Sequence, residues 1–197
     1  GGLRTALRIG CVVMAAGLSR RFGGGKLQAE FEGRALLRRA LEAVPAEEYC
    51  AVAVVTRDAA GDALAEAFGF RPVRNPAPEL GVSGTIRLGL EALGNCDAAL
   101  FQVADQPLLR RETVRAELEF FRARPDCISA LSHGGVRGNP CVFPARFFPE
   151  LLALEGDRGG SAVIKRHPDA LRLFEAPARE LLDVDTPEAL RALGETK

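Results

Sequence analysis

The stretch IGCVVMAAGLSRRFGGGK, residues 9–26, decides the fold of this chain. It begins with a short, continuous apolar run over residues 9–14, which is typical of a strand buried on both faces of a parallel sheet. The rest, residues 15–26, mixes small residues with arginine and lysine. This part follows the carboxyl end of the strand, where open α/β sheets bind their ligands. The stretch therefore predicts a buried strand followed by a ligand-binding loop.

The composition of the loop favours an anionic ligand. Arg21 offers a planar fork to two oxygens, and Lys26 offers a compact charge to one. Four glycines allow positive φ and let backbone N–H groups approach phosphate oxygens: Gly17, Gly23, Gly24 and Gly25. A plain glycine-rich turn with solvated cations has the same composition, so the spacing alone leaves both interpretations open.

Two common phosphate-binding signatures do not fit the loop. A Walker loop needs Gly where this chain has Arg20, and Ser or Thr where Leu27 follows the lysine. The dinucleotide fingerprint needs three closely spaced glycines, whereas five residues separate Gly17 from Gly23. The loop is therefore neither of these motifs.

The composition predicts one globular domain over residues 1–197. Lysine plus arginine and aspartate plus glutamate both number 26, so no overall charge favours nucleic acid or an anionic membrane. No apolar stretch approaches the roughly 20 residues of a membrane span, and the amino-terminal residues lack the apolar core of a secretory signal. We therefore expect a cytoplasmic protein that binds neither nucleic acid nor membrane.

The cysteines and histidines predict no disulfide framework and no structural zinc site. The five cysteines are widely spaced, contain no Cys-x-x-Cys pair and adjoin apolar runs, which favours buried, reduced thiols. His133 and His167 are not at ligand spacing from a cysteine or from each other. The cysteines are Cys11, Cys50, Cys96, Cys127 and Cys141.

After the loop, strand and helix patterns alternate. This alternation predicts right-handed crossovers and a mainly parallel sheet with helices on both faces. The expected strands are residues 9–14, 51–56, 71–75 and 98–103, and the expected helices are residues 35–44, 59–68 and 83–93, with Ser83 as an N-cap.

The second half predicts a small antiparallel addition. Two apolar runs flank the glycine-rich segment at 133–138, as in a pair of strands joined by a turn. The expected strands are residues 127–131, 141–143, 171–174 and 181–184, and the expected helices are residues 112–122, 147–154, 161–165 and 187–193. The fold class is therefore a three-layer αβα, Rossmann-like arrangement.

Acidic residues follow two of the expected strands. Asp105 follows the run at 98–103, and a carboxylate there can bind a hard cation such as magnesium, although it can equally be a turn or N-cap residue. Asp183 and Asp185 point to the same side if the segment is extended. One carboxylate on each side of a crevice would hold one Mg²⁺ against a triphosphate. Asp185 or Thr186 would alternatively cap a helix that begins at Pro187.

Three further loops are rich in small polar residues. They offer N–H groups, hydroxyls and an arginine to a nucleotide or a second anion, and each alone is equally typical of turn or capping chemistry. The loops are Asn75 with 81–85, the segment 138–140, and the segment 156–161.

Taken together in order, these motifs resemble the molybdenum cofactor cytidylyltransferases, a MobA/MocA-like group within the GT-A-like nucleotidyltransferases. The matching segments span almost the whole chain and are far more specific than the first loop alone. They are AAGLSRRFGGGK (15–26), GVSGTIRLGL (81–90), ADQP (104–107), GNPCVF (138–143), GDRGG (156–160) and DVDTPEAL (183–190).

The resemblance implies a magnesium-dependent enzyme that joins CMP from CTP to the phosphate of molybdopterin and releases pyrophosphate. It assigns Arg21, Lys26 and Asp105 to catalysis, and Asp105 with Asp185 to the metal, with Asp183 as the alternative. The implied nucleotide contacts are Ala15, Ala16, Gly17, Leu18, Ser19, Arg21, Lys26, Asn75, Gly81, Ser83 and Thr85. The implied acceptor contacts are Gly138, Asn139, Pro140, Asp157 and Arg158.

Two positions bear on the substrates. The Ala15–Ala16 pair is similar to the cytidylyl members, whereas the guanylyl branch carries Gly-Gly there. Asn139 departs from the histidine that the family often has before the proline, which opens the alternative of another phosphorylated acceptor. A related nucleotidyltransferase that uses another base, as in GTP, is a separate alternative. A further alternative is a non-catalytic carrier of cofactor. A molybdenum hydroxylase, or its chaperone, is the implied partner protein.

Overall fold

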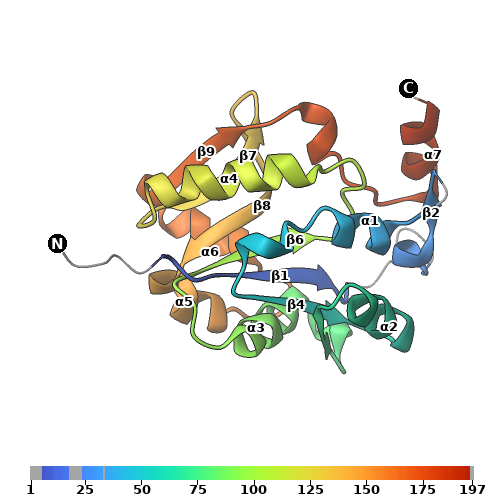
Figure 1. The fold of residues 1–197 in the computed structure, drawn as a ribbon, viewed down its shortest axis with the longest axis horizontal. Coiled ribbons are helices and arrows are strands. Elements are labelled where there is room, and N and C mark those ends of the chain that lie inside the picture. The colour runs from blue at the N-terminus through green and yellow to red at the C-terminus, as the bar shows by residue number, and fades with distance from the viewer. Residues whose placement is uncertain (1–5, 18–23, 33, 196–197) are drawn as a thin grey trace.

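A mixed seven-stranded sheet forms the centre of the molecule, with the order β5-β4-β1-β6-β8-β7-β9 (Figure 1). The structure is a computed structural model that describes residues 6–17, 24–32 and 34–195. The strands of this sheet are β1 (Ile9–Ala15), β4 (Ala51–Thr56), β5 (Arg71–Arg74), β6 (Ala98–Val103), β7 (Ile128–His133), β8 (Val136–Pro144) and β9 (Leu171–Glu175).

Four strand pairs of the sheet are parallel and two are antiparallel. Strand β1 pairs in parallel with both β4 and β6, β4 pairs in parallel with β5, and β7 with β9. Only β8 runs against its neighbours, β6 and β7. The mainly parallel sheet with a small antiparallel addition is thus confirmed.

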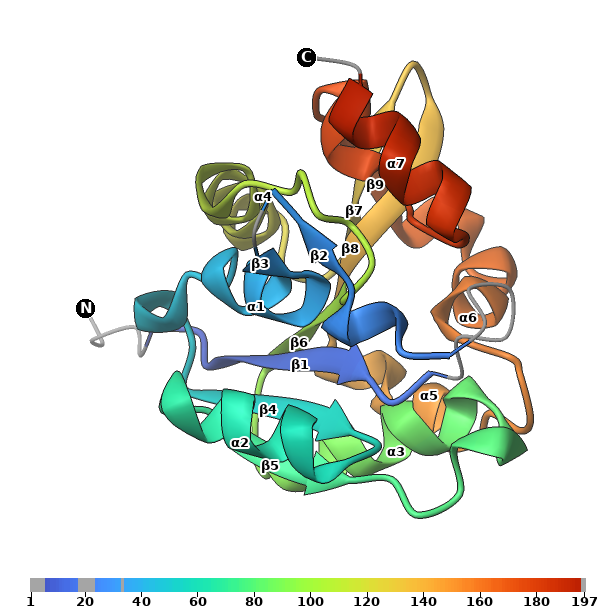
Figure 2. The same cartoon turned by 90° about the vertical axis from the view of Figure 1, so that its right-hand side faces the viewer.

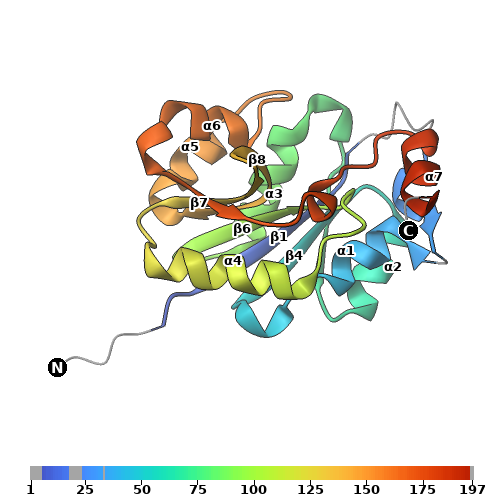
Figure 3. The same cartoon turned by 90° about the horizontal axis from the view of Figure 1, so that it is seen from above.

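Helices cover both faces of the sheet, as Figure 3 shows from above. The α-helices are α1 (Leu36–Glu42), α2 (Ala59–Ala67), α3 (Val82–Leu93), α4 (Arg111–Ala123), α5 (Phe148–Leu152), α6 (Gly160–Arg166) and α7 (Pro187–Glu195). Helices α1, α2 and α4 pack in one apolar cluster and α3, α5 and α6 in the other.

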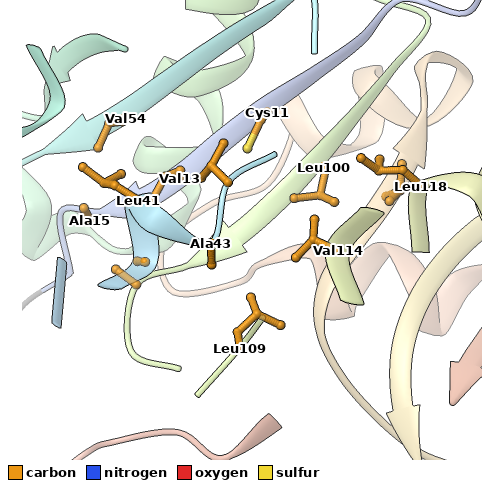
Figure 4. Packing of buried hydrophobic residues seen from close by; sticks show 14 of the residues in the cluster. Cys11, Val13, Ala15, Leu41, Ala43, Val54, Leu100, Leu109, Val114 and Leu118 are labelled. Atoms are coloured by element: carbon orange, nitrogen blue, oxygen red, sulfur yellow. The ribbon is translucent and has the colours of Figure 1, made fainter. Parts of the chain in front are cut away.

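Successive side chains of β1 point to opposite faces of the sheet and so contribute to both apolar clusters. Cys11 and Val13 lie in the cluster with α1, α2 and α4, whereas Val12 lies in the cluster with α3, and all three are 0% exposed. Figure 4 shows Val13 gathered with Leu41 of α1 and neighbouring apolar side chains. Both faces of β1 are buried, as its continuous apolar run predicts.

A third, smaller cluster lies at the edge of the molecule. The hairpin β2 (Glu30–Phe31) and β3 (Arg34–Ala35), which the sequence analysis did not predict, brings Phe31 against Leu36 and Val184. Leu190 and Leu193 of α7 pack on the same cluster. This packing anchors the acidic segment at 183–185 to the folded core.

Two local predictions are wrong. Ser83 is not the N-cap of α3, because that helix already begins at Val82 and is preceded by Gly81. Residues 181–184 form no strand, because residues 178–181 form the 3₁₀ turn η6 (Ala178–Leu181). The Val184 N–H instead donates to the carbonyl oxygen of Asp105 at 2.9 Å, outside any sheet.

The carboxyl-terminal helix begins as one of the alternatives expected. Helix α7 begins at Pro187, and the N–H of Ala189 donates to Thr186 Oγ1 at 3.0 Å. Thr186 therefore caps the helix, which leaves Asp185 without that task. Within the described residues, no helix is long and apolar enough to cross a membrane.

All five cysteines are free, but they are not all buried. Cys11, Cys127 and Cys141 are buried as expected. Cys50 is exposed and Cys96 is half-buried, which corrects the expectation for these two. Cys50 directly precedes β4, and Cys96 stands two residues before β6, so both lie at the amino ends of these strands.

Helix α4 buries a carboxyl group. Glu117 is 0% exposed, and neither of its carboxyl oxygens has a hydrogen-bond partner among the described residues. Burial raises the pKa of Glu117 well above its usual 4.5, because a charge is poorly solvated there. The folded protein therefore keeps a proton that the unfolded chain releases.

We expect Glu117→Gln to change the pH dependence of stability. Above about pH 4.5 the wild-type protein loses stability as pH rises towards the raised pKa, and the variant lacks this loss. Its unfolding temperature should therefore exceed that of the wild type by a margin that grows with pH, to roughly 3–6 °C at pH 8. Thermal unfolding between pH 4.5 and pH 8 measures this margin.

Glu119→Gln is the matched control on the same helix, because the Glu119 side chain is 82% exposed. It should show no pH-dependent margin. A margin for Glu117→Gln that is constant across the pH range would contradict the burial argument.

Candidate functional site

A crevice opens at the carboxyl ends of β1 and β6. From β1 the chain continues to β4 and β5 on one side and returns to β6 on the other, so the strand order reverses between β1 and β6. Figure 2 views the molecule from this side. Such reversal points are where open α/β sheets bind ligands. Gly17 after β1 and Asp105 after β6 both line a cavity of about 370 Å³ here.

Lys26 and Asp105 face each other in this cavity. The Nζ atom of Lys26 lies 3.5 Å from Asp105 Oδ2, and the two side chains are 16% and 23% exposed. Lys26 begins the 3₁₀ turn η1 (Lys26–Gln28), and Gly25 before it has a φ of 65°. A residue with a Cβ rarely adopts this conformation, so the glycine sets the direction from which the lysine enters. The two strand ends thus place a cation and a carboxylate together.

Two further carboxylates, Asp183 and Asp185, act electrostatically on this pair. Burial raises the pKa of Asp105 and the charge of Asp185 raises it further, although Lys26 opposes both effects. Although Asp183 is exposed as a whole residue, partial burial of its carboxyl, then Asp105 and Asp185, raise its pKa to about 6. Lys26 therefore does not balance the negative charge of the cluster.

A backbone hydrogen bond holds the acidic segment at 183–185 beside Asp105. Val184 is 0% exposed in the cluster with Phe31 and Leu36. Its N–H donates to the Asp105 carbonyl, so Asp183 and Asp185 stand on either side of an anchored residue. Asp183 and Asp185 therefore lie on a loop that is hydrogen-bonded to the Asp105 backbone, and not at the end of the predicted strand.

The carboxylates of Asp105, Asp183 and Asp185 suit a cation that keeps most of its bound water. Within the described ranges, no group of three His, Cys, Asp or Glu side chains converges closely enough to hold a metal ion. Mg²⁺, however, usually binds through one or two carboxylates together with water and substrate phosphates. Burial first, and the neighbouring carboxylates in addition, raise the pKa values of Asp105 and Asp183, and a divalent cation would stabilise their charged forms. Asp105 with Asp183 or Asp185 would hold it.

Gln106 ties three segments together. Its Nε2 donates to the carbonyl oxygens of Asn139 and Glu180, both at 3.1 Å, and its side chain is 3% exposed. The loop that carries Asp105 is thereby fixed to β8 on one side and to η6 on the other. The sequence analysis assigned no role to this residue, although it stands inside the ADQP motif.

A tight backbone contact joins two of the loops predicted to bind substrates. Gly81 has a φ of 110°, and a Cβ there would lie 2.2 Å from the carbonyl oxygen of Gly156. The N–H of Ser83 donates to the same oxygen at 3.1 Å. Gly81 and Asp157 both line the main cavity. Asp157, which the resemblance assigns to the acceptor, therefore lies beside the nucleotide loop.

A side-chain hydrogen bond joins Asn75, which precedes this loop, to Thr85 in the helix that follows it. The Nδ2 of Asn75 donates to Thr85 Oγ1 at 3.1 Å, and its Oδ1 accepts from the N–H of Ala77 at 2.9 Å. Thr85 lines the main cavity, whereas Asn75 and Ser83 do not. Asn75 and Ser83 are buried, so they contribute to the shape of the loop.

The first loop is described in part. Ala16 and Gly17 line the main cavity, and Ala15 lines a separate cavity of about 170 Å³ beside Arg57. Gly17 does not have a positive φ, but a Cβ there would have no neighbour within 4 Å. The predicted contacts Leu18, Ser19 and Arg21 lie outside the described residues.

A side pocket of about 140 Å³ continues from the main cavity. The two share Met14, Val82 and Val103. Its inner wall is apolar, with Phe101 and Phe143 in edge-to-face contact. Its polar lining residues are Arg137, Asn139 and Ser161. The structure thus places Asn139 in a side pocket next to the Lys26–Asp105 pair.

The predicted acceptor residues Gly138, Pro140 and Arg158 do not line the side pocket. Pro140 is buried and follows Asn139 through a cis peptide bond. Gly138 packs closely on Leu181, where a Cβ would lie 3.2 Å from Cδ1. Arg158 is exposed and lines neither cavity. Arg137, which the sequence analysis did not single out, donates instead to Ser161 Oγ at 2.8 Å across the pocket.

Comparison with protein families gives a clear match. Residues 11–171 match the profile of the family described as "MobA-like NTP transferase domain". This range includes the first loop, Asp105 and both cavities, and it ends before the acidic segment at 183–185. Comparison with curated protein sequences gives no significant match.

Solved structures of similar fold cover nearly the whole chain. Rv0371c from Mycobacterium tuberculosis has a TM-score of 0.81 at 25% identity, over 98% of this chain and 100% of its own. A second structure of that protein, with manganese, has a TM-score of 0.76 at 24% identity, over 96% and 100%. A CMP:2-keto-3-deoxy-manno-octonic acid synthetase complexed with CTP has a TM-score of 0.76 at 16% identity, over 95% and 97%.

Proposed function

This chain belongs to the MobA-like NTP transferase domain family and is a nucleotidyltransferase, and we propose that it transfers CMP from CTP to the phosphate of molybdopterin, with release of pyrophosphate. The observation that carries the proposal is the Lys26–Asp105 pair in the crevice between β1 and β6. A cation from one strand end and a carboxylate from the other suit a triphosphate bound with a metal ion.

In this proposal the chain works by positioning and electrostatics. Phosphoryl transfer needs little covalent chemistry from the protein, so no protein nucleophile is assigned. Lys26 and Arg21 bind the triphosphate and stabilise the departing pyrophosphate. Asp105, with Asp185 or Asp183, holds Mg²⁺, which would offset the charge that develops on the phosphates. The raised pKa values of Asp105 and Asp183 support this site, because burial and, after it, the neighbouring carboxylates disfavour charged forms that a bound cation would stabilise.

Two observations support the proposal that the nucleotide is CTP and that a divalent metal ion takes part. Ala16 is 0% exposed and lines the cavity, so a small side chain stands at the position where the cytidylyl members also have alanine. The CMP:2-keto-3-deoxy-manno-octonic acid synthetase of similar fold was solved with CTP, and Rv0371c with manganese. We assign CTP and magnesium on this basis, with Gly81 and Thr85 as further nucleotide contacts.

The side pocket is the proposed acceptor site. It adjoins the main cavity, so a bound phosphate acceptor could approach the α-phosphate of the nucleotide in line. Asn139 and Arg137 supply its polar groups, and Asp157 lies at the main cavity beside it. We further propose that residues 1–197 act as one cytoplasmic domain, and that a molybdenum hydroxylase or its chaperone receives the product.

Pyrophosphate release tests the proposal. The protein is incubated with MgCl₂, molybdopterin and each nucleoside triphosphate in turn, and we expect release with CTP to exceed release with GTP by at least about tenfold. Omission of molybdopterin or addition of EDTA should abolish it. A lack of release with CTP would contradict the proposed reaction.

Asn139 favours a second candidate acceptor, because it departs from the histidine expected at the pocket. Sugar phosphates and polyol phosphates, tested with CTP and with GTP, distinguish this candidate from the first. Tight binding of molybdopterin without turnover of any nucleotide would instead indicate a carrier of the cofactor.

A further inference from the structure

Two thiols meet at the edge of the sheet opposite the crevice. The Sγ atoms of Cys50 and Cys96 lie 3.5 Å apart, although 46 positions separate the residues in the sequence. Cys50 directly precedes β4, and Cys96 stands two residues before β6. Both therefore lie at the amino ends of parallel strands, whereas the cavities lie at the carboxyl ends.

A glycine in the intervening strand makes room for this contact. Strand β1 lies between β4 and β6, and Gly10 of β1 pairs with Ala51. A Cβ at Gly10 would lie 3.0 Å from Cys96 Sγ and 2.7 Å from Leu93 Cδ1. The absence of a side chain thus lets the Cys96 sulfur lie over β1.

Both cysteine backbones are held near this position. The N–H of Cys50 donates to the carbonyl oxygen of Ile9 at 2.9 Å. Helix α3 packs over β1 and β4, so the loop that leaves it towards β6 passes over β1 and carries Cys96 there. Asp97 then fixes the loop, because its N–H donates to the Arg8 carbonyl and its Oδ2 accepts from the Arg8 N–H, both at 2.7 Å.

The surroundings of the two thiols differ. Cys50 is exposed, so a small oxidant in solution reaches it first. Cys96 is half-buried, and burial followed by the neighbouring Cys50 raises its pKa to about 12. The other three cysteines are buried. Cys50 is thus the thiol that meets an oxidant, and Cys96 is the neighbour close enough to react with the product.

We propose that Cys50 and Cys96 form a modification site at which peroxide closes a reversible disulfide between the starts of β4 and β6. Peroxide oxidises the Cys50 thiol to a sulfenic acid and releases water. The Cys96 sulfur attacks the Cys50 sulfur, a second water leaves, and the S–S bond forms. The two thiols lose two electrons and two protons, and the peroxide is reduced to two waters. A dithiol reductant reverses the step.

The disulfide should stabilise the fold without altering the crevice. Closing the bond shortens the distance between the two sulfurs from 3.5 Å to about 2.0 Å, and we expect the exposed Cys50 side chain to make this short movement by rotation. The bond would close the loop of residues 50–96 in the unfolded chain, so the unfolding temperature should rise by roughly 5–10 °C. Nucleotide turnover should stay the same.

Treatment of the full chain with hydrogen peroxide tests the site. We expect the mass of the intact protein to fall by two hydrogens. Peptide mapping should find one cross-linked pair of peptides, which contain Cys50 and Cys96, and dithiothreitol should restore both thiols. Cys50→Ser and Cys96→Ser should each abolish the cross-link and the rise in unfolding temperature. Cys127→Ser, which changes a cysteine outside the pair, should retain both.

Three results would overturn the proposal. They are a gain of oxygen at Cys50 without a cross-link, a disulfide between two chains, and a cross-link that lowers the unfolding temperature. None of these measurements depends on the substrate of the enzyme, so the inference and the proposed function fail independently.

Discussion

Asp105→Asn is expected to lower kcat for pyrophosphate release by on the order of 10³-fold. The amide is nearly the same size as the carboxylate but cannot supply the negative charge that holds a metal ion against the triphosphate. The fold should not suffer, because burial already raises the pKa of Asp105 and so disfavours its charged form. We therefore expect an unfolding temperature equal to or above that of the wild type.

The experiment combines a magnesium titration of the rate with thermal unfolding. Asp169→Asn is the matched control, because Asp169 is an exposed aspartate on a 3₁₀ turn and lines neither cavity. It should keep the wild-type rate. If Asp105→Asn keeps more than a tenth of the wild-type rate at saturating magnesium, the proposal that Asp105 binds the metal ion is wrong.

Gly81→Ala is expected to damage both stability and substrate binding. The φ of 110° is unfavourable for alanine, and the new Cβ would lie 2.2 Å from the Gly156 carbonyl oxygen and 2.7 Å from the Asp157 nitrogen. Both are backbone atoms and cannot turn aside as a flexible side chain could. We expect a loss of roughly 2–5 kcal/mol in the free energy of unfolding, from strain together with overpacking.

Denaturant unfolding measures this loss, and KM for the nucleotide should rise in the fraction that remains folded. Gly69→Ala separates strain from overpacking, because Gly69 also has a positive φ, of 78°, but a Cβ there would have no neighbour within 4 Å. It should lose clearly less stability than Gly81→Ala. Equal losses would mean that overpacking between the two loops contributes nothing to the loss of stability in Gly81→Ala.

The sequence predicts the sheet and the crevice well, because both follow from short-range patterns. The apolar run at 9–14 becomes β1 with both faces buried, and Asp105 reaches the same crevice as Gly17. The rule that ligands bind where strand order reverses then needs only the order of the elements.

What the sequence does not predict depends on contacts between distant segments. The two hydrogen bonds of Gln106, the approach of Gly81 to Gly156 and the meeting of Cys50 with Cys96 leave no local pattern. The strand predicted for the segment 181–184 is wrong for a related reason, because the apolar residues of this segment are typical of a short strand, whereas Val184 is buried by the distant cluster with Phe31 and α7. Glu117 faces the core although its residue type favours the surface.

The contact between Gly81 and Gly156 also limits how this enzyme can be redesigned. Because the backbones of residues 81 and 156–157 leave no space for a methyl group between them, an insertion or exchange in one loop changes the surface on which the other rests. A loop grafted from a relative to alter base selectivity should therefore be transplanted together with its counterpart. Among relatives, the lengths of these two loops should vary in concert.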